Sequence, residues 1–395
     1  MPGLLFTAPR VIPAAGGVAG RDAAVLEPGY LVADGGRITA VGAGPPPPDA
    51  GRGRERIELA AGTLVPGFVD LQVNGYYGTD FGDTDADGWA AVASRLPETG
   101  TTAFLPTFVT APLPRLAAAL RSAGKIIPRI ERGARMLGVH LEGPFLSPAR
   151  RGAHNPAWLT APAPAAVGEL LAAGSGVLRL VTLAPELDGG LAAVRQLAAA
   201  GTVVSVGHSD ATAAQVAAAA DAGARMVTHL YNAQRPLHHR EPGVVGQALA
   251  DPRLTSGLIA DLVHVAAQAC LIAFAAAPGR ICLVTDAAAC AGLPPGDYLL
   301  GGEPIRLPPG AAAPVRPDGM LAGSALRMDR AVANLVSAGA GLAAAVAAAT
   351  RVPADLIGEP GLGRLAPGAR ADLAWLDGDL RTRGTWVAGE QVYRA

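Results

Sequence analysis

The sequence predicts an α/β protein: a (β/α)8 TIM-like barrel with a small β-sandwich domain formed by both termini. First, from Gly62 onward, eight short apolar runs alternate with Ala- and Leu-rich stretches, as strands alternate with helices in a parallel barrel. Second, polar residues follow many of these runs. Third, the sequence before Gly62 and after Thr350 has the pattern of short strands and turns.

The first 60 residues predict short strands and turns. Arg37–Val41 alternates apolar and polar residues as a half-buried strand does, and Gly35–Gly36 before it is typical of a turn. Pro45–Pro48 predicts a stiff loop, because proline cannot donate to a sheet ladder.

The middle of the chain predicts eight strand–helix units. The expected strands are Thr63–Leu71, Thr102–Leu105, Met136–Leu141, Val177–Leu183, Thr202–Val206, Arg225–Thr228, Ser256–Ala260 and Ile281–Thr285. The clearest expected helices are Leu113–Ala123, Leu191–Ala200, Thr212–Ala222 and Ala266–Ala276. A doubly wound open sheet is the alternative. The recurrence of polar residues after the strands favours the barrel.

The C-terminal segment returns to strand-like text without helices of its own. Ala371–Leu376 predicts a strand, and Thr385–Tyr393 predicts a hairpin around Gly389. We expect residues 1–60 and 351–395 to form one β-sandwich domain, and residues 61–350 to form the barrel.

The composition of the chain excludes some classes of partner and of catalytic group. The 395 residues are 50% hydrophobic and 16% charged, with a net charge of −1, which favours neither nucleic acid nor a membrane surface as a partner. Lys125 is the only lysine, so a catalytic lysine or a lysine-bridged metal pair is not expected. Three cysteines without a paired spacing indicate a reduced, cytoplasmic setting. We expect no signal peptide and no membrane helix.

Polar side chains follow the predicted strands and should meet at one mouth of the barrel. They are Gln72, Asn74, Glu142, His208, His229, Asp261, His264 and Asp286. A carboxylate and two imidazoles at one point suit a catalytic divalent ion, with a position left for water. The set therefore predicts Glu142, His208 and His229 as metal ligands, with Asp286 exchanging protons with the water and the leaving group.

Each of these residues also has a structural interpretation. His208 alone would suit a hydrogen-bonded core histidine, Glu142 an ion-pair partner of an arginine, and Asp286 a helix cap. Their convergence favours the metal site. Arg240 and His264 are candidate phosphate binders, although Arg240 would also suit a solvated loop.

An ordered set of motifs resembles one family, the N-acetylglucosamine-6-phosphate deacetylases of the amidohydrolase superfamily. The motifs are Pro66–Gly75, His140–Phe145, Arg151–His154, Val206–Ser209, Thr228–Asn232, His238–Gly243, Leu283–Asp286 and Leu321–Leu326. The resemblance extends from about residue 60 to 390. It implies a barrel enzyme with Glu142, His208 and His229 as ligands and Asp286 as the acid/base.

The resemblance also implies a phosphorylated amino sugar as substrate and a homodimer, in which the neighbouring subunit can supply an active-site loop. The implied substrate contacts are Ala153, His154, Asn232, Ala233, Arg240, His264, Leu321, Ala322 and Gly323. His154 would polarise the acetyl carbonyl, and Arg240 and His264 would hold the 6-phosphate, with Asn232 and the Ala233 backbone facing the same end.

The resemblance leaves the metal and the sugar less defined. Gln72 and Asn74 stand where much of the superfamily has His-x-His, and amides are poorer ligands than imidazoles. We therefore expect one ion, with Gln72 and Asn74 orienting nearby groups. Zinc is the first expectation, and iron, cobalt or manganese are alternatives. The family pattern is not followed at Gln234, Arg235 and Cys290, which bears on sugar specificity.

The expected reaction is hydrolysis of N-acetylglucosamine 6-phosphate to glucosamine 6-phosphate and acetate. The nearest rival is the same reaction on the galactosamine epimer or another N-acyl amino sugar phosphate. A second rival is a cyclic-amide or nucleobase hydrolase on the same barrel. Without the lysine bridge and His-x-His, the chain fits a binuclear cyclic-amide hydrolase poorly. A non-catalytic scaffold is the rival from another class, and the presence of Glu142, His208, His229 and Asp286 opposes it.

Overall fold

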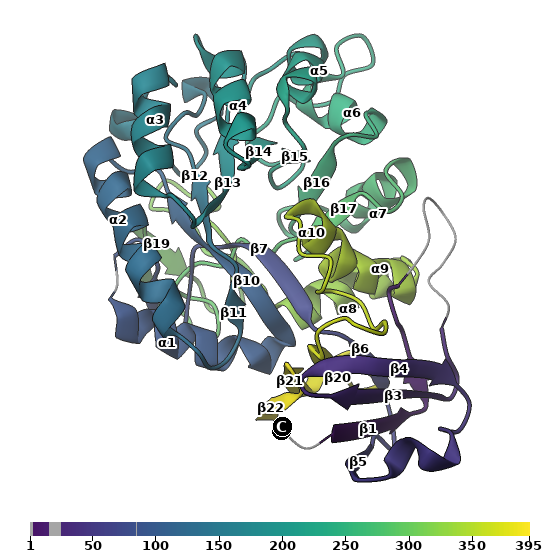
Figure 1. The fold of residues 1–395 in the computed structure, drawn as a ribbon. Coiled ribbons are helices and arrows are strands. Elements are labelled where there is room, and N and C mark those ends of the chain that lie inside the picture. The colour runs from purple at the N-terminus through teal and green to yellow at the C-terminus, as the bar shows by residue number, and fades with distance from the viewer. Residues whose placement is uncertain (1–2, 16–24, 84) are drawn as a thin grey trace.

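Eight parallel strands form a barrel in the computed structural model, which describes residues 3–15, 25–83 and 85–395 (Figure 1). In order around the barrel they are β7 (Phe68–Val73), β10 (Thr101–Val109), β12 (Val139–Glu142), β13 (Leu178–Leu183), β14 (Val203–Val206), β15 (Met226–Val227), β16 (Thr255–Leu258) and β17 (Ile281–Leu283). The barrel closes between its first and last strands, where Asp286 N donates to Gln72 O at 2.9 Å and Asn74 N to Ala287 O at 2.9 Å. The predicted barrel is confirmed, and the open-sheet alternative is wrong.

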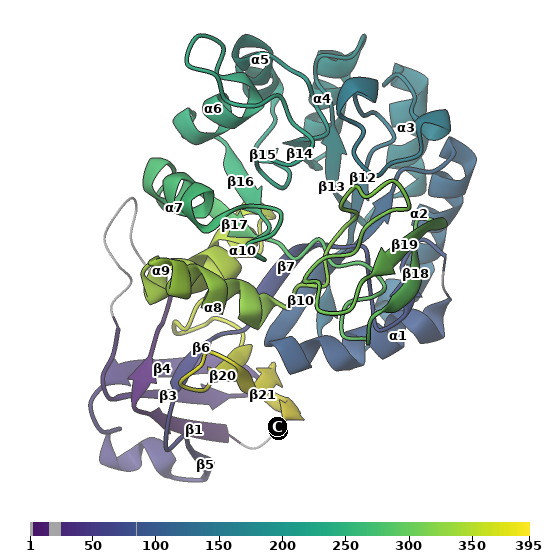
Figure 2. The ribbon, with the colours of Figure 1, turned by 180° about the vertical axis from the view of Figure 1, so that it is seen from behind.

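Helices cover the outside of the barrel (Figures 1 and 2). They are α1 (Ala86–Arg95), α2 (Leu113–Ile126), α3 (Pro164–Ala173), α4 (Gly190–Ala199), α5 (Ala213–Ala222), α6 (Gly243–Ala250), α7 (Ala267–Ala276), α8 (Met328–Ala338), α9 (Leu342–Ala349) and α10 (Arg351–Leu356). Helix α5 shows why such segments begin and end where they do. Thr212 and Gln215 form a capping box at its start, and Gly223 ends it at φ 120°.

Both ends of the chain meet in a second unit made of two sheets. One sheet has the order β4-β3-β1-β5 and the other β2-β6-β20-β21-β22. Their strands are β1 (Gly3–Ala8), β2 (Arg10–Val11), β3 (Gly29–Asp34), β4 (Arg37–Ala43), β5 (Arg54–Glu58), β6 (Thr63–Pro66), β20 (Leu373–Leu376), β21 (Thr382–Val387) and β22 (Glu390–Arg394). Phe6 and Trp386 bridge the sheets, with ring centroids 5.0 Å apart in an edge-to-face arrangement.

Three elements differ from the sequence-based expectations. The run Thr63–Leu71 is divided, because β6 pairs with β20 of the terminal unit while β7 enters the barrel. The second barrel strand continues beyond Leu105 to Val109, across Pro106, where the β7 pairing shifts register. Residues 351–356 form a helix, whose apolar Val352 and Ala354 are buried in the barrel's hydrophobic cluster.

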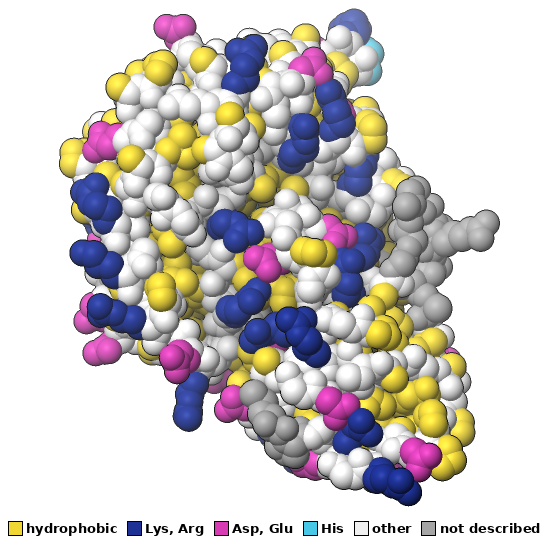
Figure 3. All heavy atoms as spheres, in the orientation of Figure 1, with side chains coloured by type: hydrophobic (Ala, Val, Ile, Leu, Met, Phe, Trp, Pro, Cys, Tyr) yellow, Lys and Arg dark blue, Asp and Glu magenta, His cyan; other side chains and the backbone are white. Residues whose placement is uncertain are grey.

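A hairpin formed by β18 (Gly296–Leu300) and β19 (Glu303–Leu307) follows the last barrel strand. Gly301 N in its turn donates to Asp80 Oδ2 at 2.6 Å, which attaches the hairpin to the segment after β7. Among the described residues, no helix combines the length and apolar character needed to cross a membrane. Figure 3 shows basic and acidic side chains interspersed on one face, in keeping with the small net charge.

The Phe6–Trp386 contact yields a stability prediction. Phe6 is fully buried, so Phe6→Ala should lower the free energy of unfolding by about 3–5 kcal/mol through lost burial and a cavity. Urea denaturation measures the change. Leu299→Ala, at a side chain that is 51% exposed, is the control and should stay within about 0.5 kcal/mol of the parent. Equal stability of the two variants would contradict a shared core between the chain ends.

Candidate active site

Three polar residues leave the barrel strands in a left-handed backbone conformation. His208 follows β14 at φ 47°, His229 follows β15 at φ 28°, and Asp286 follows β17 at φ 52°. Non-glycine residues adopt this region at a cost of about 1–3 kcal/mol each, which persists only where the surroundings fix it. These turns direct the three side chains to the mouth of the barrel, and such strain clusters at functional sites.

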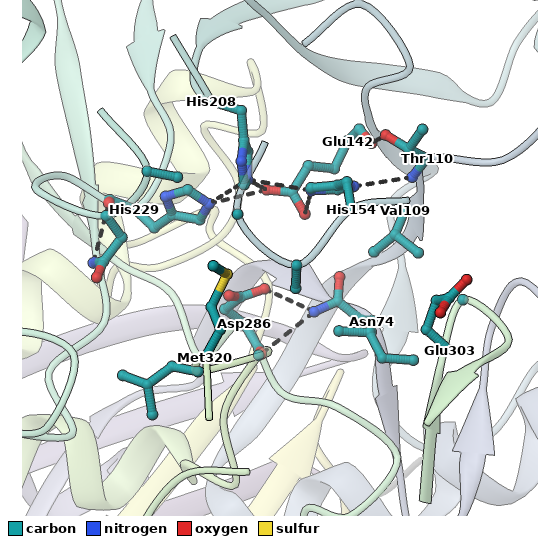
Figure 4. Close-up of a pocket in the computed structure, with 18 of the residues that line it drawn as sticks. Asn74, Val109, Thr110, Glu142, His154, His208, His229, Asp286, Glu303 and Met320 are labelled. Atoms are coloured by element: carbon teal, nitrogen blue, oxygen red, sulfur yellow. Dashed lines mark hydrogen bonds and ion pairs between the residues drawn. The ribbon is translucent and has the colours of Figure 1, made fainter. Parts of the chain in front are cut away.

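Glu142, at the end of β12, meets two imidazoles there (Figure 4). Its Oε1 lies 3.1 Å from His229 Nε2 and 3.3 Å from His208 Nε2. The two Nε2 atoms lie 3.1 Å apart. All three side chains are buried. The structure thus brings the three expected metal ligands to one point.

The donor atoms fit a divalent ion. His208 Nδ1 donates to Arg150 O at 3.0 Å, so Nε2 is the ring atom that faces Glu142 and His229 and that would bind an ion. Burial alone would raise the pKa of Glu142, but the hydrogen bonds and charges of His208 and His229 hold it well below its usual value. An ionised carboxylate and two imidazoles are the ligand set of a catalytic zinc site.

Asp286 is held beside this cluster by two amides. Its Oδ1 accepts from Asn74 Nδ2 at 2.7 Å and from Gln72 Nε2 at 3.0 Å. Gln72 Nε2 also lies 3.0 Å from Glu142 Oε1, so one amide joins the two carboxylates. Burial and the nearby charge of Glu142 raise the pKa of Asp286 to about 6. A carboxyl group with such a pKa suits proton exchange near neutral pH.

His154 lies next to the cluster on the loop after β12, with its Nε2 3.2 Å from His208 Nε2. Its Nδ1 accepts the backbone N–H of Thr110 at 3.4 Å, which places the ring proton on Nε2. Burial, together with the charge of His208, lowers the pKa of His154 to about 3. His154 is therefore a neutral hydrogen-bond donor at the cavity.

The cluster opens into a cavity of about 420 Å³, a size that suits a small-molecule ligand. Its lining includes most of the residues implied for substrate contact: Ala153, His154, Asn232, Ala233, His264, Leu321 and Gly323. His264 is supported from behind, because its Nδ1 lies 2.6 Å from Asp261 Oδ2.

Two expected substrate contacts lie elsewhere in this single chain. Arg240 does not line the cavity. It is exposed on the loop between β15 and α6, with Nη1 2.8 Å from His239 Nε2. Ala322 does not line the cavity either; it is buried in a small cluster with Ala288 and Cys290.

Sequence reasoning missed four residues that shape the site. Thr110 orients His154, and the Arg150 carbonyl orients His208. Asn155 Nδ2 donates to Glu303 Oε1 at 2.8 Å at the cavity wall, which joins the loop carrying His154 to the β18–β19 hairpin. Thr110 directly follows β10 and is therefore a polar residue at a strand end. It was missed because that strand was expected to end at Leu105. The backbone carbonyl of Arg150 has no sequence signal.

Comparison with known proteins agrees with this geometry. Residues 63–392 match the model of the amidohydrolase family. The N-acetylglucosamine-6-phosphate deacetylase of Danio rerio is 41% identical over 357 residues, covering 86% of this chain and 86% of the relative. The N-acetylgalactosamine-6-phosphate deacetylase of Escherichia coli O157:H7 is 40% identical over 335 residues, covering 84% and 88%.

Solved structures agree as well. A mutant N-acetyl-D-glucosamine-6-phosphate deacetylase from Mycobacterium smegmatis, in complex with N-acetyl-D-glucosamine-6-phosphate, has a TM-score of 0.90 at 38% identity, over 99% of this chain and 100% of that one. The deacetylase from Pasteurella multocida has a TM-score of 0.90 at 29% identity over all of both chains. This chain belongs to the amidohydrolase family, in the branch that contains the N-acetylglucosamine-6-phosphate deacetylases.

Proposed function

We propose that the protein hydrolyses the acetamide of N-acetylglucosamine 6-phosphate to glucosamine 6-phosphate and acetate. The convergence of Glu142, His208 and His229 beside Asp286 and the neutral His154 carries the proposal. These groups and His264 line the same cavity. Relatives that bear the name of this activity support it.

The metal would be one divalent ion, proposed as zinc, held by Glu142, His208 and His229. When bound, such an ion polarises a carbonyl and lowers the pKa of water. The proton transfers are carried out by the chain's own residues. Asp286 accepts the proton of the attacking water and later delivers it to the leaving nitrogen. Gln72 and Asn74 keep its carboxylate oriented for both steps.

His154 would bind the acetyl group. The N–H of its Nε2 is directed at the cluster and can form a hydrogen bond to the acetyl oxygen, where negative charge develops as water adds. The resulting tetrahedral carbon then releases the amine, which takes its proton from Asp286. The products are acetate and the free amino sugar phosphate.

The phosphate would bind against His264, Asn232 and Ala233, which all line the cavity. Asp261 keeps His264 oriented. We infer that Arg240 reaches the phosphate of a neighbouring subunit in a homodimer, which its exposed position outside the cavity of its own chain supports. We also place the protein in the cytoplasm, a proposal supported by three free, buried cysteines.

The galactosamine epimer is the second candidate substrate. The relative from Escherichia coli O157:H7 that is named for that epimer is 40% identical over 84% of this chain. Gln234 and Arg235 lie beside the site but not in the cavity lining, so they would affect the sugar only indirectly.

Metal content tests the ligand assignment. The purified protein should contain about one zinc ion per chain, the count expected of a site with three protein ligands. His229→Ala should lose most of the ion, as measured by inductively coupled plasma mass spectrometry. His238→Ala, at an exposed histidine, is the control and should retain it. Equal metal content in both variants would contradict the assignment.

Removal of the proton carrier should separate metal binding from turnover. Asp286→Asn should keep its metal but lose about 10²- to 10⁴-fold in kcat, because an amide cannot accept the proton. Steady-state assays of acetate release, together with metal analysis of the same sample, measure both quantities. A near-normal kcat would show that another group moves the proton.

Substrate preference tests the phosphate assignment. The kcat/KM for N-acetylglucosamine 6-phosphate should exceed that for unphosphorylated N-acetylglucosamine by at least about 10²-fold, since charged hydrogen bonds to phosphate contribute about 1.5–3 kcal/mol each. Equal values would exclude the phosphate site. The 6-phosphate of the galactosamine epimer, assayed in parallel, decides between the two candidate sugars.

A further inference from the structure

Gln234 and Arg235 lie in the loop that follows His229 and do not line the cavity. We propose that Gln234 is a positioning residue that fixes the loop carrying His229, and that Arg235 supports the carbonyl that orients His208. The inference rests on the proposed metal function and deepens it.

The Gln234 side chain is a buried clamp. It is only 4% exposed. Its Nε2 donates to Thr228 O at 2.6 Å, and its Oε1 accepts from Tyr231 N at 3.1 Å. These two backbone groups lie on either side of His229. One amide therefore fixes the backbone before and after a proposed ligand.

The clamped loop needs such support. His229, Tyr231 and Ala233 all have left-handed backbones, with φ of 28°, 78° and 50°. Three strained non-glycine residues within five positions would relax without contacts that fix them. Because both polar ends of the Gln234 amide are used inside this loop, an apolar side chain of the same size would leave a backbone donor and a backbone acceptor without their partner.

The backbone around Gln234 also reaches the segment that follows His208. Ser209 N donates to Ala233 O at 3.2 Å, and Arg235 N donates to Ser209 O at 3.0 Å. This pairing joins the loop after β15 to the loop after β14, so the two proposed imidazole ligands share one support.

Arg235 supports His208 indirectly, because it and Arg150 pair with the same carboxylate, Asp210. Its Nη2 lies 2.7 Å from Asp210 Oδ2, and Arg150 Nε lies 2.8 Å from Asp210 Oδ1. The carbonyl of that same Arg150 accepts from His208 Nδ1. The Arg235 and Asp210 side chains are 33% and 30% exposed, so solvent screens this pair. We therefore expect Gln234 to have the larger effect.

Such supports change the affinity for an ion, because donors that are already in place need not be ordered when it binds. Loss of a partner that orients a ligand typically costs about 10- to 100-fold in metal affinity or activity. A side chain with only a packing role would instead change the stability of the metal-free protein and leave the affinity unaltered.

The test compares Gln234→Leu with Gln196→Leu in the full chain. Gln196 is the control for loss of a glutamine amide, because its partly exposed side chain on α4 donates to a backbone carbonyl away from the site, that of Pro164 at 3.3 Å. Competition with a chromogenic chelator gives the zinc Kd. The visible spectrum of the cobalt-loaded protein reports ligand geometry, and calorimetry gives the Tm of the metal-free protein.

We expect Gln234→Leu to raise the zinc Kd about 10- to 100-fold and to shift the cobalt spectrum, while Gln196→Leu changes neither. A lower Tm with unaltered Kd and spectrum would overturn the positioning role. Arg235→Met serves if Gln234→Leu does not fold: a several-fold higher Kd is expected, and an unchanged Kd overturns the proposal. An unmutated protein that binds no ion would instead contradict the proposed metal function itself.

Discussion

The rest of the site depends on one interaction, the compensation of the buried Glu142 carboxylate by the polar groups around it. A charge taken out of water costs several kcal/mol unless donors and opposite charges surround it. Here His208, His229 and Gln72 approach its Oε1 within 3.3 Å. In the metal-free protein, the Nε2 atoms of His208 and His229 compensate this charge as hydrogen-bond donors. When an ion binds, the same atoms would release their protons and coordinate it. The electrostatic requirement and the proposed metal chemistry are therefore met by the same atoms.

The backbone contact that closes the barrel also places the proposed proton carrier, Asp286. The contact between the first and last strands runs through Gln72 O and Asp286 N. Below it, the buried Asp70 accepts from Thr285 N at 3.2 Å and from Thr285 Oγ1 at 2.6 Å. Burial, opposed in part by the Thr285 hydroxyl, raises the pKa of Asp70 to about 7. A polar group in a barrel core is tolerated where it holds a functional turn, and this one holds the residue before Asp286.

The sequence allowed the barrel, the order of its strands and the convergence of the polar residues to be predicted, because alternation of apolar runs and strand-end chemistry are local signals. It could not reveal the extent of β10, since Pro106 interrupts a pattern that the structure continues through a register shift. Contacts that use backbone atoms, such as Arg150 O on His208, leave no trace in residue type. The position of Arg240 depends on loop geometry and, under the proposed homodimer, on a second chain. The sequence marked Gln234 only as a residue that does not follow the family pattern. The structure shows that its side chain bonds to the backbone on both sides of His229.

The central claim is that one ion binds where Glu142, His208 and His229 meet. Anomalous diffraction at the zinc absorption edge, from crystals of the metal-loaded protein, tests it most directly. The account predicts one strong peak per chain, within bonding distance of the Glu142 carboxylate, His208 Nε2 and His229 Nε2, at about 2.0–2.2 Å. A peak at other residues, or a second strong peak beside Gln72 and Asn74, would contradict it.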